Sequence, residues 1–600
     1  MIVMRMHRDR AIHHPATSSS EGKTVNVPLL VSLRHSVRHA QRRVRAKVIM
    51  ALVVIVSTSS MPLAACGYND DASSSHRGYD HIADYKPTSR DQIKDGGHLN
   101  LAIDELTTQE NPFHGDGTSY TTTIWSYYNP ELAMYTPRGE FSPNHDYVTD
   151  IKEDTSSGKT VLTYTINPRA VYNDGTPIDW RAFENTWKAN NGTDEDYIPS
   201  STDGYKLIES VTPGENDKQA VVTFSQVYPW WKGLFNILLP PQVSDAKTFN
   251  NAYKSTLHPE WGAGPYTVDH VNFKKGEVVF KRNDKWWGDK GKLDSITFRQ
   301  MEPQASINAL RAGEIDATSV GSRERLKTAE KMGKLVDIRT GAAPSTSLIT
   351  LNAKSDILSD INVRKAVMTG IDRSQLATIR FNGMGYSEKL PGSFQLFSRQ
   401  KGYDDNFGAV VKFNKDEAQQ ILEQDGWKRG SDGVRRKDGK KLQLKYVLLG
   451  DDSLSRATAQ ATQKMMSDIG VQLSIQERPS SEFSDVVTRR DFDMFPMGFS
   501  QSDPYGVAYF QQTYASDSQL NRSGTGTAEM DEKINELQKL PTEDEQIRRA
   551  NELEKEAFAC YGIMPVTNGP SITAANPDLV NFGPKFFGNV KLQDIGWKKK

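Results

Sequence analysis

Cysteine is nearly absent from this sequence, because its 600 residues contain only Cys66 and Cys560. No pair of Cys or His residues has the spacing of a zinc site. The sequence also has no Gly-x-Ser-x-Gly motif and no recognisable Ser-His-Asp or Cys-His arrangement for a nucleophile. We therefore expect a protein that is not an enzyme and that holds no cofactor and no metal.

Long hydrophobic runs are also lacking. One apolar run at 48–56 is shorter than the roughly 20 residues that cross a bilayer, and nothing after it approaches that length. Residues 1–65 contain ten Lys or Arg and two Asp or Glu, so the rest of the chain is near −9 although the whole carries −1. Because nucleic-acid binding needs a basic surface that neutralises phosphates, we expect no nucleic-acid partner.

The apolar run belongs to an ordered series of features. Basic residues precede it at 42, 43, 45 and 47, and small residues follow it and end in Leu63-Ala64-Ala65-Cys66. This order is the layout of an export signal, and its last four residues resemble a bacterial lipobox. The alternative is a short buried core helix, followed by these four residues by chance. The signal predicts a lead and signal peptide over 1–65, lipidation of Cys66, a polar tether over 66–96, and a lone, buried structural thiol at Cys560.

Strand and helix patterns alternate along the rest of the chain. His98–Ile103 and Thr160–Ile166 alternate with period two and predict strands. Asp179 can cap a helix from Trp180 to Lys188, and a helix over Ala305–Ala312 should stop at the following glycine and lead directly into a strand. The second half repeats this order, so we predict an α/β fold with mixed sheets.

Five stretches resemble one known family. They are, in chain order, 162–166 with the Asn-Asp-Gly-Thr-Pro turn at 173–177, 262–266 with 281–288, 309–316, 361–367 with 371–373, and 414–427. Together they resemble the oligopeptide/dipeptide-binding class (family 5) of solute-binding proteins, the extracytoplasmic receptors of ABC importers, over residues 97–597. We interpret these blocks mostly as scaffold, with Arg364 and Asp372 as a structural charge pair and Trp286 and Trp287 as packing aromatics.

The resemblance implies a two-lobed fold like that of periplasmic binding proteins, with a hinged cleft between the lobes. The expected domains are lobe I at 97–145, 256–346 and 566–600, an extra domain of lobe I at 146–255, and lobe II at 347–565. Ligand would be enclosed between the lobes when they close.

The same resemblance points to one segment of lobe II for ligand binding. In peptide-binding relatives an aspartate of this segment holds the peptide's α-amino group, and the matching stretch here is 497–506, where Asp503 is the only carboxylate. Counting from Gly498 places that position on Ser502, so the segment is shortened relative to peptide binders. Asp503 is therefore a candidate amine ligand, and capping of a turn before Pro504 is its alternative role.

Other candidate ligand contacts come from position and chemistry. Asn111 and Phe113 follow the first strand, at the ligand-facing edge of the lobe in relatives. Trp230 and Trp231 could stack on a sugar or line a peptide pocket, or they could pack the extra domain. The remaining candidates share the segment of Asp503: Phe499, Ser500, Gln501, Ser502 and Tyr505.

The expected function is capture of di- or oligopeptides and their delivery to the permease subunits of an ABC importer. The protein would be a monomer at the extracytoplasmic face of the cell membrane, held there by the lipid on Cys66. Two alternatives stay open: the same receptor role for an oligosaccharide or another non-peptide solute, and a non-transport role in envelope assembly or regulation. Loss of amine recognition would favour the sugar.

Overall fold

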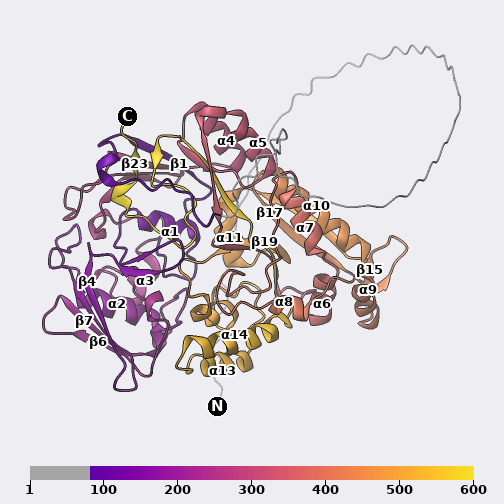
Figure 1. The fold of residues 1–600 in the computed structure, drawn as a ribbon. Coiled ribbons are helices and arrows are strands. Elements are labelled where there is room, and N and C mark those ends of the chain that lie inside the picture. The colour runs from indigo at the N-terminus through magenta and orange to yellow at the C-terminus, as the bar shows by residue number, and fades with distance from the viewer. Residues whose placement is uncertain (1–80) are drawn as a thin grey trace, which may run out of the picture. The chain divides into compact units, whose positions relative to one another are not determined.

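The computed structural model of the chain describes residues 81–600 (Figure 1). The chain divides into two units, 1–73 and 74–600, and the described residues all belong to the second. Cys66, the apolar run and the first part of the predicted tether lie outside the described residues. Within the described part, no helix is both long enough and apolar enough to cross a membrane.

The largest sheet has seven strands and mixes parallel with antiparallel pairs. Its strands lie in the order β12 (Asp337–Ala342), β21 (Pro570–Ala575), β11 (Ala317–Ser319), β1 (His98–Ile103), β10 (Ser295–Gln300), β9 (Glu277–Arg282) and β8 (Tyr266–Asn272). The strand expected at His98–Ile103 is confirmed as β1. Leu99, Leu101 and Ile103 face a hydrophobic core while His98 is exposed, which is the period-two burial that the sequence displays.

A four-stranded antiparallel sheet lies within residues 146–255, the range predicted for the extra domain. We call these residues the extra domain, and their domain boundaries stay a prediction. The strands of the sheet lie in the order β4 (Val148–Asp154), β5 (Val161–Ile166), β7 (Gln219–Phe224) and β6 (Ile208–Pro213). Helix α2 (Trp180–Asn190) packs on this sheet. The ring of Phe183 on α2 lies 4.9 Å from the ring of Tyr164 on β5. Asp179 caps α2 as expected, because its side chain accepts a hydrogen bond from the Arg181 N–H at 2.9 Å.

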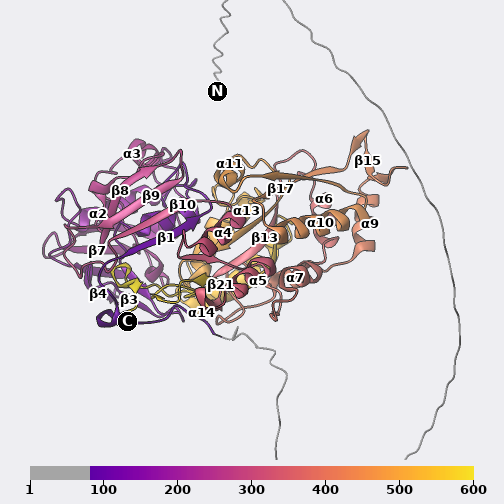
Figure 2. The ribbon, with the colours of Figure 1, turned by 90° about the horizontal axis from the view of Figure 1, so that it is seen from above.

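A five-stranded sheet is built from the second half of the chain. Its strands lie in the order β18 (Gln472–Arg478), β17 (Gln443–Leu449), β19 (Met494–Ser500), β13 (Ser345–Leu351) and β20 (Ile563–Thr567). Helix α10 (Ser453–Asp468) connects β17 to its parallel neighbour β18 and packs on both. Figure 2 shows β17 and α10 on one side of the view and β8, β9 and β10 on the other.

The remaining elements are short. The other α-helices are α1 (Ser119–Ser126), α3 (Ala246–Asn251), α4 (Pro303–Ala312), α5 (Arg323–Lys331), α6 (Ile361–Thr369), α7 (Arg373–Phe381), α8 (Asn406–Val410), α9 (Lys415–Gln424), α11 (Phe483–Arg489), α12 (Phe510–Tyr514), α13 (Ala528–Leu537) and α14 (Glu543–Phe558). The small sheets contain β2 (Ala133–Tyr135) with β3 (Phe141–Pro143), β14 (Lys428–Arg429) with β15 (Arg435–Lys437) and β16 (Lys440–Lys441), and β22 (Leu579–Val580) with β23 (Gly596–Trp597). Helix α4 ends where expected, because Gly313 takes a left-handed φ of 73°.

The described chain passes between the two larger sheets at two places. The first crossing, 343–344, joins β12 to β13, and the second crossing, 568–569, joins β20 to β21. We call residues 81–342 together with 570–600 the first lobe, and residues 345–567 the second lobe. The domain boundaries expected at 346 and 566 lie near these crossings and stay predictions.

The two crossings are held together by polar contacts. The side-chain amide of Asn568 donates to the carbonyl oxygen of Ser345 at 3.1 Å and to the hydroxyl of Thr346 at 2.8 Å. Glu388 of the second lobe accepts hydrogen bonds from the backbone N–H groups of Asn568 and Gly569, both at 2.8 Å. One carboxylate therefore fixes the backbone of the second crossing.

Two expectations about single residues are wrong. Arg364 and Asp372 form no ion pair in the described structure. The Arg364 guanidinium donates to the carbonyl oxygens of Leu358 at 2.8 Å and Cys560 at 3.0 Å, whereas Asp372 caps α7 by accepting from the Ser374 N–H at 2.9 Å. Cys560 is half-buried rather than buried. Carbonyl acceptors satisfy a guanidinium as well as a carboxylate does, so sequence proximity to an aspartate misled the prediction.

The two adjacent tryptophans Trp286 and Trp287 pack as expected. Both rings lie 5.5 Å from the ring of Tyr147. Their indole N–H groups donate to backbone carbonyl oxygens, of Asp289 at 3.0 Å and Asp146 at 2.8 Å. These rings therefore serve the packing of the first lobe against the extra domain.

The ordered body begins within the stretch 66–96, which the sequence predicts to be a polar tether. Ile93 is fully buried, and the Lys94 N–H donates to the carbonyl oxygen of Trp597 at 2.7 Å. Further upstream, the carbonyl oxygen of Ile82 accepts from the Ala342 N–H at 3.0 Å. The second half of the expected tether is therefore part of the first lobe. Its polar composition suggested a free linker, but its backbone groups find partners on the C-terminal segment.

Candidate functional site

Asp503 lies in the loop that follows β19, at the surface where the second lobe meets the extra domain. Its side chain is 1% exposed. One carboxylate oxygen accepts from the backbone N–H of Tyr505 at 2.9 Å, and the other accepts from the hydroxyls of Tyr509 at 2.7 Å and Ser502 at 3.0 Å. The turn-capping role expected as the alternative is therefore present.

The charge of Asp503 is not balanced by a cation. Burial raises the pKa of Asp503, and the three hydrogen bonds lower it by a smaller amount. No Lys, Arg or His lies within ion-pair distance of it among residues 81–600. A carboxylate offers about four lone-pair positions and three of them are taken here, so one acceptor position remains for a further donor.

Aromatic residues of both lobes surround the Asp503 loop. The Tyr509 hydroxyl that binds Asp503 also lies 3.2 Å from the carbonyl oxygen of Gly233 in the extra domain. The ring of Tyr505 lies 6.2 Å from Tyr135 and 6.1 Å from Trp230, which both belong to the first lobe. The loop that the sequence singled out is therefore in contact with residues from across the lobe interface.

The two tryptophans of the extra domain have different surroundings. Trp230 is 5% exposed, and its indole N–H donates to Gln546 of α14 at 2.8 Å, across the lobe interface. Trp231 lies 5.8 Å from Phe141 in an edge-to-face arrangement and carries the Lys232 ammonium 5.5 Å above its ring. The structure brings Trp230, but not Trp231, to the Asp503 loop, and ligand contact by either stays a prediction.

The other residues predicted on the Asp503 loop are less buried. Phe499 packs its ring 5.1 Å from that of Phe394 and remains half-buried. Gln501 donates from its side-chain amide to the carbonyl oxygen of Gln395 at 3.0 Å, while its own buried amide oxygen has no hydrogen-bond partner in the described structure. Ser500 and Ser502 are exposed. These groups can still donate to or accept from a bound solute.

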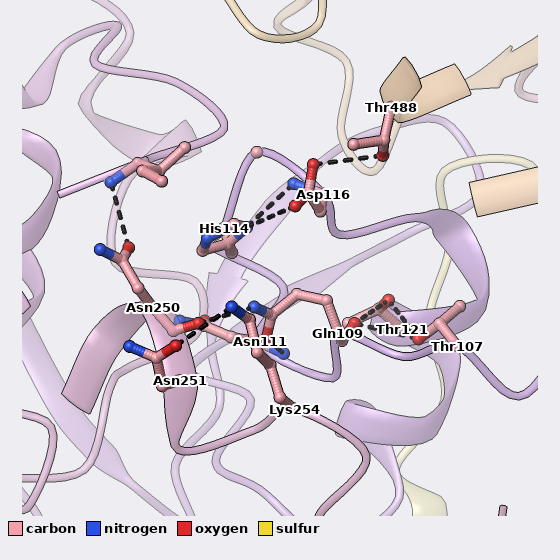
Figure 3. A network of polar contacts seen from close by, with 12 residues as sticks. Thr107, Gln109, Asn111, His114, Asp116, Thr121, Asn250, Asn251, Lys254 and Thr488 are labelled. Atoms are coloured by element: carbon pink, nitrogen blue, oxygen red, sulfur yellow. Dashed lines mark hydrogen bonds and ion pairs between the residues drawn. The ribbon is translucent and has the colours of Figure 1, made fainter. Parts of the chain in front are cut away.

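Asn111 and Phe113 are placed in the interior of the first lobe (Figure 3). The Asn111 side chain donates to the carbonyl oxygen of Phe249 at 2.9 Å and accepts from the Phe113 N–H at 3.1 Å. Phe113 is 8% exposed and packs in a cluster with Trp125 and Tyr253. These contacts fix the path of the loop after β1, and ligand contact by the two residues stays a prediction.

The same loop reaches the second lobe a few residues further on. The Asp116 carboxylate accepts from the hydroxyl of Thr488 in α11 at 3.2 Å, and Figure 3 shows this bridge beside His114. The carbonyl oxygen of Gly115 accepts from the Arg522 guanidinium at 2.8 Å. The rigid Asn111 turn thus positions a loop whose tip contacts the opposite lobe.

Two acidic side chains between β1 and this tip are also perturbed. Burial raises the pKa of Glu105 to about 7, and Glu105 accepts from the hydroxyl of Ser484 in the second lobe at 3.0 Å. Burial raises the pKa of Glu110 to about 8. One of its carboxylate oxygens accepts from the Thr107 hydroxyl at 2.7 Å, and the other has no hydrogen-bond partner among the described residues. At neutral pH these groups therefore carry less than full negative charge.

A second buried aspartate spans the lobe interface, and no sequence pattern indicates it. Asp203 of the extra domain accepts from the Gln512 N–H at 2.7 Å and from the side-chain amide of Gln538 at 2.7 Å, both in the second lobe. The Ser201 hydroxyl supplies a third hydrogen bond at 2.9 Å. Burial raises the pKa of Asp203 to about 6. In the sequence it stands in a Ser-Thr-Asp-Gly stretch that reads as an ordinary turn.

Comparisons with known proteins agree with this architecture. Residues 140–521 match the model of the bacterial extracellular solute-binding proteins, family 5 Middle. The chain is 33% identical over 516 residues to the oligopeptide-binding protein OppA of Mycobacterium tuberculosis, which covers 85% of this chain and 86% of that protein. It is also 28% identical over 316 residues to the oligopeptide-binding protein AppA of Bacillus subtilis, which covers 47% of this chain and 56% of that protein.

Solved structures show the same fold. The structure of AppA from Bacillus subtilis in complex with a nonapeptide matches with a TM-score of 0.71 and 20% identity, over 85% of this chain and all of that one. A periplasmic EDTA-binding protein, EppA, matches with a TM-score of 0.72 and 23% identity, over 86% of this chain and 98% of that one. These two ligands differ in chemistry, so the shared fold leaves the solute undetermined.

Proposed function

Because the chain belongs to family 5 of the bacterial extracellular solute-binding proteins, we propose that it captures peptides outside the membrane and delivers them to an ABC importer. The observation that carries the peptide assignment is Asp503. A buried carboxylate without a cation, at the interface between two lobes, suits the ammonium group of a peptide N-terminus.

Closure of the lobes would create this site. The two crossings allow the lobes to rotate about residues 343–344 and 568–569, which is a hinge transition. Contacts such as Asp203 with Gln512 and Asp116 with Thr488 then hold the closed form. Ligand that binds only the closed form shifts the lobes toward closure by mass action.

The lipid anchor remains part of the proposal. The layout that ends at Cys66 supports export and lipidation, and the ordered body begins by Ile82. A short tether between them would keep a monomeric receptor close to the permease in the same membrane. Intact-mass analysis of the membrane-extracted protein tests this, since a diacylglyceryl group on Cys66 is expected and an unmodified N-terminus would exclude it.

A thermal-shift screen tests the peptide assignment. Di- to pentapeptides should raise the melting temperature of the protein, because a ligand bound only to the native state stabilises it. The same peptides with an acetylated N-terminus should bind roughly tenfold to hundredfold more weakly, which corresponds to a charge-assisted hydrogen bond of about 1.5–3 kcal/mol.

Asp503→Asn sharpens the same test. The substitution should weaken binding of free-amine peptides and leave the acetylated ones unchanged. Asp438→Asn is the control, because Asp438 is exposed in the second lobe and its left-handed φ of 50° suits asparagine. If Asp503→Asn keeps the full preference of the unmodified protein for free-amine over acetylated peptides, Asp503 has no role in amine binding.

An oligosaccharide is the second candidate solute, for one specific reason. Three of the acceptor positions of Asp503 are already taken by its own loop, which is what a turn cap needs even without a ligand. In that case the exposed hydroxyls of Ser500 and Ser502 and the nearby aromatic rings would meet a sugar. Stabilisation by oligosaccharides and by no peptide would decide for this candidate.

A further inference from the structure

The first residues of the described chain form a strap on the first lobe. We call Ile82–Thr88 the strap. The carbonyl oxygen of Ile82 accepts from the Ala342 N–H at 3.0 Å, and the Asp84 N–H donates to the carbonyl oxygen of Pro584 at 2.9 Å. The strap therefore bridges the end of β12 and the C-terminal segment, which lie far apart in the sequence.

Side chains fasten the other end of the strap. Asn581, 4% exposed, accepts from the Thr88 N–H at 2.8 Å and donates to the Thr88 carbonyl oxygen at 2.9 Å. The Lys86 ammonium pairs with Asp337 of β12 at 2.6 Å. Lys86 and Asn581 both take left-handed backbone conformations, with φ of 52° and 59°, and the Asn581 N–H donates to the Lys86 carbonyl oxygen at 3.1 Å. Non-glycine residues hold such conformations only where their surroundings over-determine them.

Two glycines make room for the strap. A Cβ on Gly341 would lie 2.9 Å from the Ile82 carbonyl oxygen and 2.8 Å from Pro584. A Cβ on Gly583 would lie 2.6 Å from the Asp84 carbonyl oxygen. Both distances are below normal contact, so the close approach of the strap requires glycine at each position.

The strap ends at the first crossing between the lobes. Ala342, which binds Ile82, is the last residue of β12, and the crossing 343–344 follows it directly. On the other side of the crossing, the Pro344 carbonyl oxygen accepts from the Gln501 N–H at 2.8 Å. Gln501 belongs to the loop of Asp503. The strap and the candidate ligand loop therefore hold opposite ends of one two-residue hinge.

We propose that the strap is a hinge brace: it fixes β12 up to Ala342, so that at the first crossing the rotation of the second lobe is confined to residues 343–344. When the end of β12 is fixed, the second lobe closes along one path and the Asp503 loop reaches one closed position. When the end of β12 is mobile, the closed form is spread over several positions, so ordering it when ligand binds costs more conformational entropy. The effect on affinity rests on the proposed peptide function; the effect on the hinge does not.

Gly341→Ala tests the brace. The added methyl group should displace Ile82, so hydrogen exchange at 82–88 and at Ala342 should rise, and chymotrypsin should cut after Tyr85. The matched control is Gly321→Ala, another first-lobe glycine, where the added carbon meets only one atom at 3.8 Å. Asn581→Gly is a second variant, because glycine keeps the left-handed backbone and removes both hydrogen bonds to Thr88.

The motion of the hinge is measured first without ligand and then with a peptide ligand. Paired spin labels on Ser156→Cys and Ser431→Cys, both at exposed positions, in a background that carries Cys66→Ser and Cys560→Ser, should show a broader distance distribution in both strap variants than in the control. Affinity for a peptide that binds the unmodified protein should fall by about threefold to tenfold.

Two results would overturn the brace: a released strap with an unchanged distance distribution, or a strap that stays protected in both variants. If the unmodified protein binds no peptide, the proposed function fails, while the label distances still decide the brace.

Discussion

Asp203 in the extra domain and Asp503 in the second lobe are both buried at the lobe interface, and neither is paired with a cation in the described structure. They differ in where their hydrogen bonds originate. Asp203 takes two of its three from the opposite lobe, at Gln512 and Gln538, whereas Asp503 takes all three from its own loop. Two carboxylates that are equally buried can therefore have different roles.

Asp203 therefore belongs to a contact that exists only when the lobes are closed, whereas the Asp503 loop keeps its hydrogen bonds whether the lobes are open or closed. When the lobes open, Asp203 loses the donors of the second lobe and regains water, so its environment reports the state of the interface. Asp503 keeps its donors in either state, because they move with it. The Asp503 loop is thus formed before closure, which is what a ligand-binding loop requires if it is to meet the ligand pre-organised.

Asp203→Ala should have the largest effect on the interface. It leaves the Gln512 N–H and the Gln538 amide without acceptors in the closed form, which costs about 1–3 kcal/mol for each unmade bond. Small-angle scattering should show a more open molecule, and solute affinity should fall by tenfold or more. Asp196→Ala, at an exposed position of the same domain, is the control. An unchanged scattering profile for Asp203→Ala would show that the interface does not depend on this contact.

The sequence predicted the elements better than the interface. β1 and the cap of α2 were found because period-two burial and an aspartate before an apolar helix face are local patterns, legible within ten residues. The contact of Asp203 with Gln512 joins residues more than 300 positions apart. No local pattern encodes such a contact, because it depends on how two lobes meet.

The start of the ordered body shows the same limit. The strap is polar and carries no periodic hydrophobic pattern, so it reads as a tether. Its order comes from Asn581, Gly341 and Gly583, which lie hundreds of residues away and whose role is invisible until the chain is folded. Asp503 was found by resemblance to a family motif, while its hydrogen-bond partner Tyr509, and the contact of Tyr509 with the Gly233 carbonyl oxygen, were not.

The pH dependence of affinity should sharpen the contrast between the two aspartates. Burial raises the pKa of Asp203 to about 6 and of Glu105 to about 7 in the closed form, against the ordinary range near 4 when they face water. The closed form therefore binds more protons between pH 4 and 7, and it is favoured as the pH falls from 7 toward 5 and disfavoured as the pH rises. The Lys206 ammonium lowers the pKa of Asp203, and the value of about 6 already includes that effect.

The expected size is a gain of about tenfold in affinity from pH 7 to pH 5, by titration calorimetry with one peptide at constant ionic strength. Asp203→Ala should flatten the part below pH 6 and leave the part due to Glu105. An affinity that rises with pH would mean that closure does not bury these carboxylates.

Tyr509→Phe gives the smallest and most discriminating effect, since its hydroxyl contacts both Asp503 and the Gly233 carbonyl oxygen. The hydroxyl has a single proton to share between these acceptors, and only the contact with Gly233 is specific to the closed form. Its loss should destabilise that form by about 1 kcal/mol or less. If Asp503 is only a turn cap, the loss acts through Gly233 alone, and free-amine and acetylated peptides weaken by the same factor of about five. If Asp503 binds the amine, the substitution frees a second acceptor position on a carboxylate that already lacks a cation, and the free-amine peptide should lose less affinity than its acetylated form. The ratio of the two affinities, measured for Tyr509→Phe and for the unmodified protein, therefore distinguishes the closure contact from the ligand contact without removing the carboxylate itself.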